Sequence, residues 1–152
     1  MTEEALMRRA IALSAEAVEQ GGGPFGAVVC RDGRILGEGR NQVGPGRDPT
    51  AHAEIMAIRA ASARLGTSAL TGATLYTSCE PCPMCLGAAW WAGIGAIVYG
   101  NAGTDLALIG SDDRGLYAEI GRPHQDRRVP IRRLLAAEAR AVFEGFAAKR
   151  DG

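Results

Sequence analysis

Two short groups of residues in this sequence combine side chains that can bind a metal ion and move a proton. His52 and Glu54 stand two positions apart, and Cys82 and Cys85 form a Cys-x-x-Cys pair further along the chain. Two thiolates and one imidazole are ligands that suit zinc, and three protein ligands leave a fourth position for water or hydroxide. We therefore predict a catalytic site with one Zn²⁺ per chain, bound by His52, Cys82 and Cys85.

Glu54 is suited to carry a proton rather than to bind the metal. At the start of a helix, the side chains of His52 and Glu54 can reach one cavity without both becoming ligands. A carboxylate beside an activated water can take its proton and pass it to a leaving group, so we predict Glu54 as the catalytic residue. The cysteine pair alone would fit a redox pair or buried thiols about as well as a metal site. A non-catalytic zinc module would need no carboxylate beside the metal.

The composition is that of an ordinary globular protein. Of 152 residues, 47% are hydrophobic, and 17 basic side chains balance 17 acidic ones, which argues against a large nucleic-acid-binding surface. No apolar run reaches the ~18 residues of a membrane helix, and the first residues lack the pattern of a signal peptide. Three of the four cysteines lie within residues 79–85, too close together to link distant parts of the chain. We expect a cytoplasmic protein with one domain over residues 1–152.

Helical and strand patterns alternate along the chain. Apolar periodicity and turn residues predict helices at 2–20, 51–65, 82–92, 114–120 and 134–149, and strands at 25–30, 35–41, 73–78, 94–99 and 129–132. Thr2 and Thr50 are expected to cap the first two helices. The Asp32-Gly33 turn makes the first two strands antiparallel. We predict an α/β fold, a three-layer α/β/α sandwich with a mixed five-stranded sheet, in which two helix starts converge on the zinc.

The motifs resemble those of the cytidine deaminase-like superfamily of zinc-dependent deaminases, and within it the small bacterial guanine deaminases. The matching runs are GPFGA at 23–27, DPTAHAE at 48–54 and YTSCEPCPMCLGA at 76–88, with shorter matches at 112–113, 117–120, 123 and 128–130. His-x-Glu followed by Pro-Cys-x-x-Cys is the signature of zinc-dependent base deaminases. The resemblance implies hydrolytic removal of an exocyclic amine from a free base, with guanine giving xanthine and ammonia.

The resemblance also implies a set of substrate-binding residues. Asn41 would hydrogen-bond the base, Phe25 and Trp91 would flank its ring, and Asp113 would lie near the amine that leaves. Ala53, between the ligand and the proton carrier, completes the set. Each side chain also has an ordinary structural alternative, such as core packing for Phe25 and a turn for Asp113.

The resemblance further implies a homodimer, with the option that C-terminal segments are exchanged between subunits. The apolar run at 86–97 would supply part of the interface. A tRNA wobble adenosine deaminase shares the main motifs and is the alternative function. The five arginines between residues 122 and 133 would then bind phosphates, although we favour a solvated strand edge for them.

Two departures from the guanine deaminase pattern keep other substrates open. Residues 109–111 read Ile-Gly-Ser, where those enzymes have an aromatic residue before the acidic pair. The chain ends Lys-Arg-Asp-Gly, where such enzymes can end in a tyrosine that closes the site. Another aminated base, a nucleoside or a triazine is therefore a further alternative.

Overall fold

The computed structural model describes residues 1–152 as two compact units, 1–113 and 114–152. The expectation of a single domain over residues 1–152 stays a prediction. None of the helices combines the length and the apolar character that crossing a bilayer requires.

The first unit is built on a four-stranded mixed sheet. Its strands follow the order β2-β1-β3-β4, with β1 antiparallel to both neighbours and β3 parallel to β4. The elements in chain order are α1 (Glu3–Glu19), β1 (Gly26–Arg31), β2 (Arg34–Arg40), α2 (Val43–Gly46), α3 (Ala53–Leu65), β3 (Thr74–Cys79), α4 (Pro83–Ala92), β4 (Ala96–Asn101) and the 3₁₀ helix η1 (Gly103–Ile109). The sheet is mixed as predicted, but it has one strand fewer.

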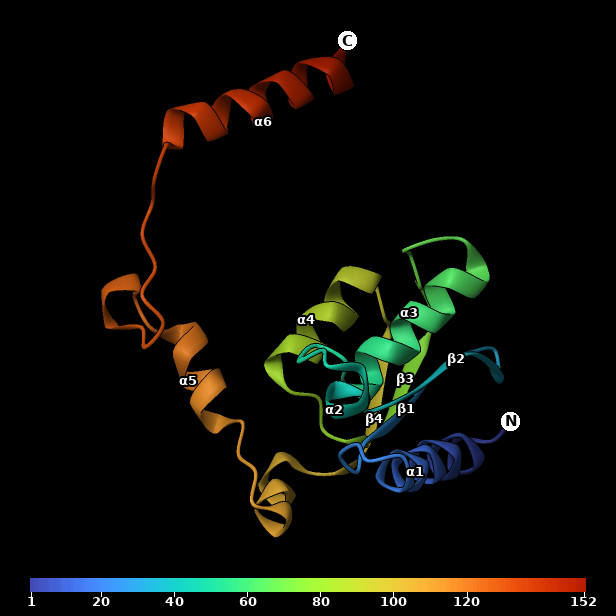
Figure 1. The fold of residues 1–152 in the computed structure, drawn as a ribbon. Coiled ribbons are helices and arrows are strands. Elements are labelled where there is room, and N and C mark those ends of the chain that lie inside the picture. Colours follow the sequence, from blue (N-terminus) through green and yellow to red (C-terminus); the bar gives the residue numbers. More distant parts are fainter. The chain divides into compact units, whose positions relative to one another are not determined.

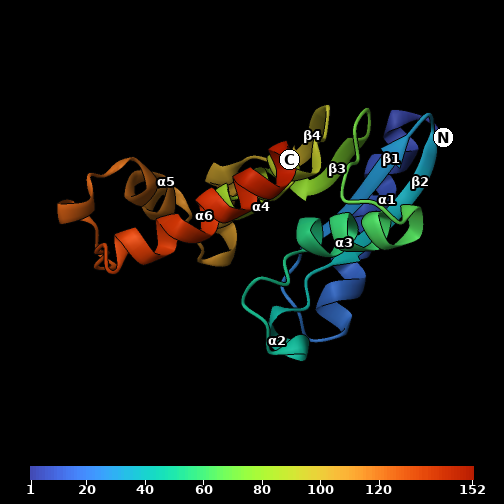
Figure 2. The same cartoon turned by 90° about the horizontal axis from the view of Figure 1, so that it is seen from above.

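Helices cover both faces of this sheet, with α1 on one side and α3 and α4 on the other (Figures 1 and 2). The buried strand β1 shows why. Val28 and Cys30 pack in the cluster formed with α1, whereas Ala27 and Val29 pack in the cluster formed with α3 and α4. Because side chains alternate along a strand, β1 contributes to a core on each face. The predicted α/β/α layering is therefore present in this unit.

Two glycines in β2 allow α3 to lie directly on the sheet. A Cβ atom at Gly39 would collide with the backbone of Ala53 and Ala57, and one at Gly37 would collide with the backbone of Ala57. Small residues on both surfaces therefore let the helix backbone approach the strand. This close contact sets the position of the first turn of α3, from which the site is built.

The start of α3 differs from the prediction. The helix begins at Ala53, with His52 in the N-cap position, instead of at residue 51 after a Thr50 cap. The hydroxyl of Thr50 donates to Oδ1 of Asp48 at 2.7 Å, and its backbone N–H donates to the same oxygen at 2.8 Å. Asp48 and Thr50 thus form a local turn, and the Thr50 hydroxyl that was expected to cap the helix is bound to Asp48 instead.

The second unit contains no strand at residues 129–132, so the predicted fifth strand is wrong. Its elements are α5 (Arg114–Gly121), the 3₁₀ helix η2 (His124–Asp126) and α6 (Ala136–Asp151). The Glu119 carboxylate accepts the backbone N–H groups of Arg128 at 3.0 Å and Val129 at 3.3 Å, and Pro130 has no N–H. Three consecutive positions therefore offer no donor to a neighbouring strand.

The arginine-rich segment at 122–133 is consequently not a strand edge. Arg127 donates to the carbonyl oxygens of Arg122 at 3.2 Å and Ile120 at 3.4 Å. Arg122 also pairs with Glu119 at 3.5 Å. Part of the segment therefore serves the internal structure of the second unit.

Candidate active site

The three predicted zinc ligands meet where α3 and α4 begin. His52 and Cys82 are the N-cap residues of these helices, and Cys85 lies in the first turn of α4. Nδ1 of His52 is 3.6 Å from Sγ of Cys82 and 3.5 Å from Sγ of Cys85, and the three ligand atoms lie within 4.8 Å of one another. A tetrahedral zinc ion, with Zn–N of about 2.0 Å and Zn–S of about 2.3 Å, would place nitrogen and sulfur about 3.5 Å apart. The donor set and its spacing therefore fit zinc.

The pKa values of the Cys82 and Cys85 thiols are shifted in opposite directions. A hydrogen bond from Cys85 and the nearby His52 lower the pKa of Cys82 to about 4, against the effect of burial. The pKa of Cys85 is raised, because hydrogen bonding to Cys82, burial and the nearby charge of Glu54 all favour the neutral thiol. Hydrogen bonding to Cys82 also raises the pKa of His52. Since zinc binds thiolates and neutral imidazole, metal binding must displace these protons.

Glu54 lies beside the ligands, with only 4% of its surface exposed. Its Oε1 accepts a hydrogen bond from the Thr77 hydroxyl at 2.8 Å, and its Oε2 accepts one from the Cys85 thiol at 2.9 Å. Both donors are neutral, but the Cys85 donor is lost when this thiol becomes a zinc-bound thiolate, so the Thr77 hydroxyl is the donor that remains. A buried carboxylate next to a metal site has the surroundings expected of a general base.

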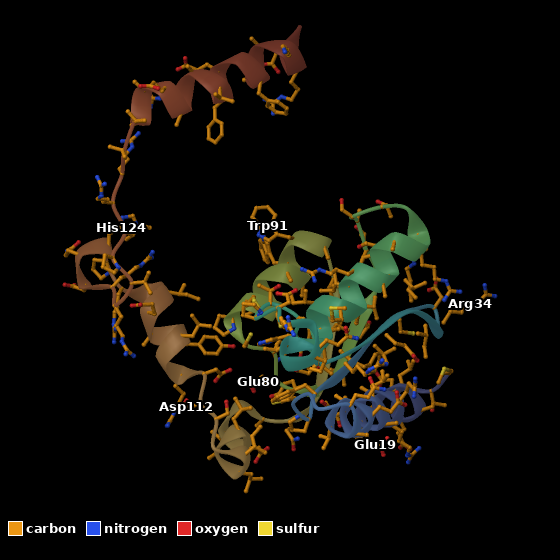
Figure 3. All side chains as sticks on the ribbon, viewed as in Figure 1. Glu19, Arg34, Glu80, Trp91, Asp112 and His124 are labelled. Carbon is orange, nitrogen blue, oxygen red and sulfur yellow. The ribbon has the colours of Figure 1, made fainter.

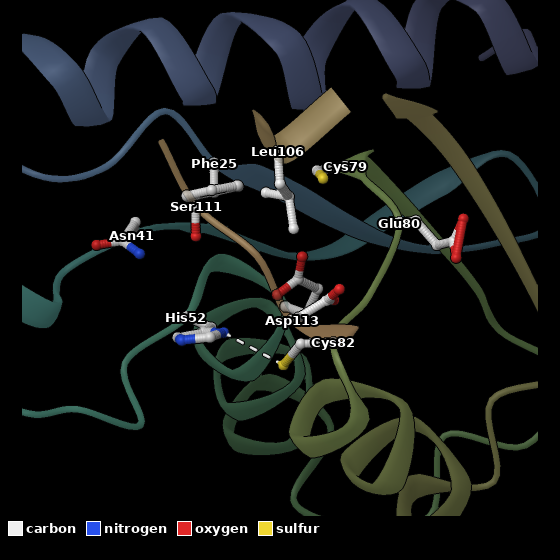
Figure 4. Close-up of a pocket in the computed structure, with 10 residues that line it drawn as sticks. Phe25, Asn41, His52, Cys79, Glu80, Cys82, Leu106, Ser111 and Asp113 are labelled. Atoms are coloured by element: carbon white, nitrogen blue, oxygen red, sulfur yellow. Dashed lines mark hydrogen bonds between the residues drawn. The ribbon is translucent and has the colours of Figure 1, made fainter. Parts of the chain in front are cut away.

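A cavity of about 170 Å³ opens onto these groups (Figure 4). Its walls come from the residue before β1, the residue after β2, the start of α3, the end of β3 with the turn before α4, and the segment from η1 to Asp113: Phe25, Asn41, His52, Glu54, Cys79, Glu80, Cys82, Leu106, Ser111 and Asp113. This is below the roughly 300–1,000 Å³ of sites for drug-sized ligands. The cavity therefore suits a molecule the size of a single base.

Asn41 presents a hydrogen-bond donor to this cavity. The backbone N–H groups of Gly23 and Val43 both donate to its Oδ1, at 3.4 and 3.2 Å. These two donors identify the oxygen end of the amide. The NH₂ group is therefore the end that faces the other residues of the cavity, as Figure 4 shows.

Carboxylates dominate the opposite part of the cavity wall. Asp113 and Glu80 lie there (Figure 4), and Glu54 is a third carboxylate that lines the cavity. Burial and the negative charges of Cys82, Asp112 and Glu80 raise the pKa of Asp113. Burial and the negative charges of Glu54, Asp113 and Glu80 raise the pKa of the Cys79 thiol to about 11. A wall rich in acceptors favours a ligand that carries N–H donors.

Two of the predicted substrate-binding residues do not line the cavity. Trp91 is 86% exposed and projects outward from α4, where it borders a separate groove between α3 and α4 (Figure 3). Ala53, the first residue of α3, is completely buried and packs in the core. Phe25, Asn41 and Asp113, by contrast, are brought together with the metal ligands and Glu54.

Several cavity residues were not singled out from the sequence. Cys79 and Glu80 lie in the cysteine-rich run, and their place between a buried strand and the metal ligands is a signal that could have identified them. Leu106 and Ser111 come from a stretch without clear apolar periodicity. Thr77 does not line the cavity but binds Glu54, and it was missed because a threonine in a buried strand is usually interpreted as a strand former.

Comparison with known proteins agrees with this geometry. The model of the cytidine and deoxycytidylate deaminase zinc-binding region matches residues 1–101. The guanine deaminase of Bacillus subtilis (strain 168) is 46% identical over 155 aligned positions, which cover 99% of each chain. Its crystal structure matches with a TM-score of 0.93 over 97% of this chain and 95% of that chain. This match includes both units.

Two further relatives match the chain less completely. The solved guanine deaminase from Nitrosomonas europaea is 37% identical with a TM-score of 0.70, covering 74% of this chain and 65% of that chain. A tRNA-specific adenosine deaminase of Haemophilus influenzae is 41% identical over 110 residues, covering 72% of this chain and 64% of that protein.

Proposed function

We propose, on the premise that this chain belongs to the cytidine and deoxycytidylate deaminase zinc-binding family, that it hydrolyses guanine to xanthine and ammonia. The observation that carries this proposal is the meeting of the zinc ligands, Glu54, Asn41 and Asp113 around one base-sized cavity. The guanine deaminase of Bacillus subtilis, which aligns over the whole chain, supports guanine as the base.

In this reaction, Glu54 moves the protons. The zinc ion held by His52, Cys82 and Cys85 supplies the Lewis acidity that makes water a nucleophile near neutral pH. Glu54 takes a proton from the attacking water while the oxygen of that water bonds to the carbon that carries the amine. Glu54 then gives this proton to a ring nitrogen. It next takes the proton of the newly bonded hydroxyl group and passes it to the amine, so that the carbonyl forms as the carbon–nitrogen bond breaks and ammonia leaves.

The polarity of the cavity suits the edge of guanine that bears its carbonyl and amine groups. The NH₂ group of Asn41 can donate to the carbonyl oxygen, and the carboxylate of Asp113 can accept from the amine or the ring N–H. Phe25 then lies against the ring. Adenine has no carbonyl group and would leave the Asn41 donor unpaired, which is the kind of mismatch that sites of this type reject strongly.

We also propose that the protein acts as a homodimer. The α4 side chains Leu86, Trp90 and Trp91 are exposed, and large aromatic residues on one helix are typical of protein contacts. Exchange of C-terminal segments is one form that such a dimer would take. Light scattering should give twice the chain mass of 15.9 kDa, and Trp91→Ala should shift the distribution toward the single chain. A single-chain mass at high protein concentration would contradict the proposal.

The function is tested by measuring ammonia release from the zinc-loaded protein. Guanine, guanosine, adenine, adenosine, cytosine, cytidine and a tRNA anticodon stem-loop are offered separately. We expect turnover of guanine, with xanthine as the product. Turnover of the stem-loop alone would instead assign the chain to tRNA editing, and turnover of a different small base would overturn the choice of guanine.

A further inference from the structure

Thr77 is a polar side chain at the centre of the first unit, and its surface is completely buried. It lies in β3, where it is paired with Ala27 of β1 on one side and Tyr99 of β4 on the other. The sheet therefore determines the position of Thr77, independently of the loops around the cavity. A hydroxyl costs free energy at such a place unless it has hydrogen-bond partners.

The Thr77 hydroxyl has two acceptors within reach. Oε1 of Glu54 is 2.8 Å from its oxygen, and the carbonyl oxygen of Cys79 is 2.9 Å away. A hydroxyl group carries a single hydrogen, so it satisfies these two acceptors only by sharing or alternating between them. The Cys79 carbonyl therefore competes with Oε1 for this hydrogen, and the charged carboxylate is the stronger acceptor of the two.

This contact distinguishes the two oxygens of Glu54. Oε1 is turned toward the sheet and Thr77, whereas Oε2 is turned toward Sγ of the metal ligand Cys85, at 2.9 Å. An oxygen that accepts from a buried hydroxyl remains an acceptor whether or not the other oxygen carries a proton. The Thr77 contact is therefore compatible with both states that a proton carrier passes through.

We propose that Thr77 is a positioning residue for Glu54: by holding Oε1, its hydroxyl makes Oε2 the oxygen that exchanges protons with water and base. This inference rests on the proposed deamination. In the reaction, the proton of the attacking water goes to Oε2 and leaves from Oε2 to the ring nitrogen, while Oε1 stays bonded to Thr77. Without the hydroxyl, the carboxylate would rotate and both transfers would lose their alignment.

The test uses variants that separate the hydroxyl from the shape of the side chain. Thr77→Val keeps the shape and removes the hydroxyl, and Thr77→Ser keeps the hydroxyl. For guanine turnover by the zinc-loaded protein, we expect Thr77→Val to lower kcat about 10- to 100-fold. This is the range seen when residues that orient the ligands of a metal site are replaced. KM and the zinc content should change little, because the residue touches neither base nor metal. Thr77→Ser should restore most of kcat.

A second pair covers the case in which Thr77→Val does not fold. Thr77→Ala and Thr77→Ser both lack the methyl group and differ only in the hydroxyl, so the ratio of their kcat values isolates it. Equal kcat values in this pair, or wild-type kcat in Thr77→Val, would overturn the inference.

A readout without turnover separates this inference from the proposed function. Crystal structures of the zinc-loaded variants should show the Glu54 carboxylate rotated in Thr77→Val and kept in Thr77→Ser. An unchanged carboxylate in Thr77→Val would overturn the positioning role even if the wild type deaminates guanine. If the wild type releases no ammonia from guanine, the proposed function fails, and these structures still show whether Thr77 orients Glu54.

Discussion

Glu38 in β2 and Glu54 at the start of α3 are held in different ways. The guanidinium of Arg9 makes two hydrogen bonds of 2.8 Å to the Glu38 carboxylate, and each side chain is 34% exposed. Glu54 is buried and receives its hydrogen bonds from the uncharged Thr77 hydroxyl and Cys85 thiol. A cation neutralises a carboxylate and ties it to the fold, whereas neutral donors orient it and leave its charge available.

The contrast separates two uses of the same functional group. The Arg9 hydrogen bonds lower the pKa of Glu38, so this carboxylate stays ionised and contributes to stability. The buried carboxylate of Glu54 forms no ion pair with its hydrogen-bond partners Thr77 and Cys85, and we assign it to proton transfer. Replacing each residue should therefore affect different measurements.

The largest effect is expected for Glu54→Gln. Removal of the proton carrier should lower the rate of guanine turnover by about 10³-fold or more, because general acid–base catalysis contributes about 10²–10⁴-fold and two transfers depend on it. Zinc content and the free energy of unfolding should stay close to the wild-type values. Glu38→Gln is the matched control and should keep full turnover. Retained activity in Glu54→Gln would show that the contrast between the two carboxylates is not functional.

The next effect is expected for Gly39→Ala, which disturbs the support of the site rather than its chemistry. The added methyl group would collide with the backbone of Ala53 and Ala57 and push the first turn of α3 away from β2. Overpacking of this kind costs about 1–3 kcal/mol of unfolding free energy, and zinc affinity should fall with it. Gly87→Ala, where an added Cβ meets nothing within 4 Å, is the control. Equal unfolding and zinc titrations for both variants would contradict this account.

A smaller effect is expected for Asp113→Asn. The change keeps the shape of the side chain and removes the negative charge that would accept an N–H of the base. The value of kcat/KM for guanine should fall about 10-fold, which corresponds to ~1.4 kcal/mol of lost binding in the transition state. Asp112→Asn serves as the neighbouring control. Steady-state kinetics that show the larger loss for the control would exclude Asp113 as the substrate contact.

The smallest effect is expected in the region of Glu38. Arg9→Ala should lower the free energy of unfolding by about 1 kcal/mol, since partly exposed ion pairs contribute up to about that amount and salt screens them. Guanine turnover should not change. Urea unfolding of wild type, Arg9→Ala, Glu38→Gln and the double variant would measure the coupling of the pair. A turnover defect in Arg9→Ala would remove the distinction between the two regions.

This ion pair also has a defined pH dependence. Because Arg9 lowers the pKa of Glu38 below its ordinary value of 4.5, the pair contributes fully above about that pH. Its contribution is lost as the pH falls through the lowered pKa of the folded state. The stability difference between wild type and Glu38→Gln should therefore be present at pH 7 and shrink toward pH 3. A difference that grows in acid would contradict the assignment.

The metal ligands could be predicted from the sequence because local geometry determines them. Cys82 and Cys85 lie within one helical turn, and His52 and Cys82 are N-cap residues, so short motifs already specify how the side chains point. The layered fold was likewise predictable, because β1 carries apolar residues for both faces. What the motifs do not contain is the distance between the two helix starts, which depends on the packing of α3 against β2.

The remaining differences come from contacts that have no local signal. The predicted strand at 129–132 does not form, because Glu119, nine or more residues earlier, accepts hydrogen bonds from the backbone N–H groups of Arg128 and Val129. Thr50 does not cap α3 because Asp48 competes for its hydroxyl. Leu106 and Ser111 reach the cavity from a segment without apolar periodicity. In each case a side-chain contact overrides the propensity of the backbone.

The fixed amide of Asn41 has a consequence for how this protein can change its substrate. An asparagine that could flip would serve a base with either a carbonyl or an amino group at that edge, and the enzyme would be promiscuous. Here the backbone N–H groups of Gly23 and Val43 hold the oxygen, so a flip would bring two donors against the NH₂ group. Broader specificity therefore requires a mutation at position 41 or in its supporting loop, and it cannot arise from a change of rotamer.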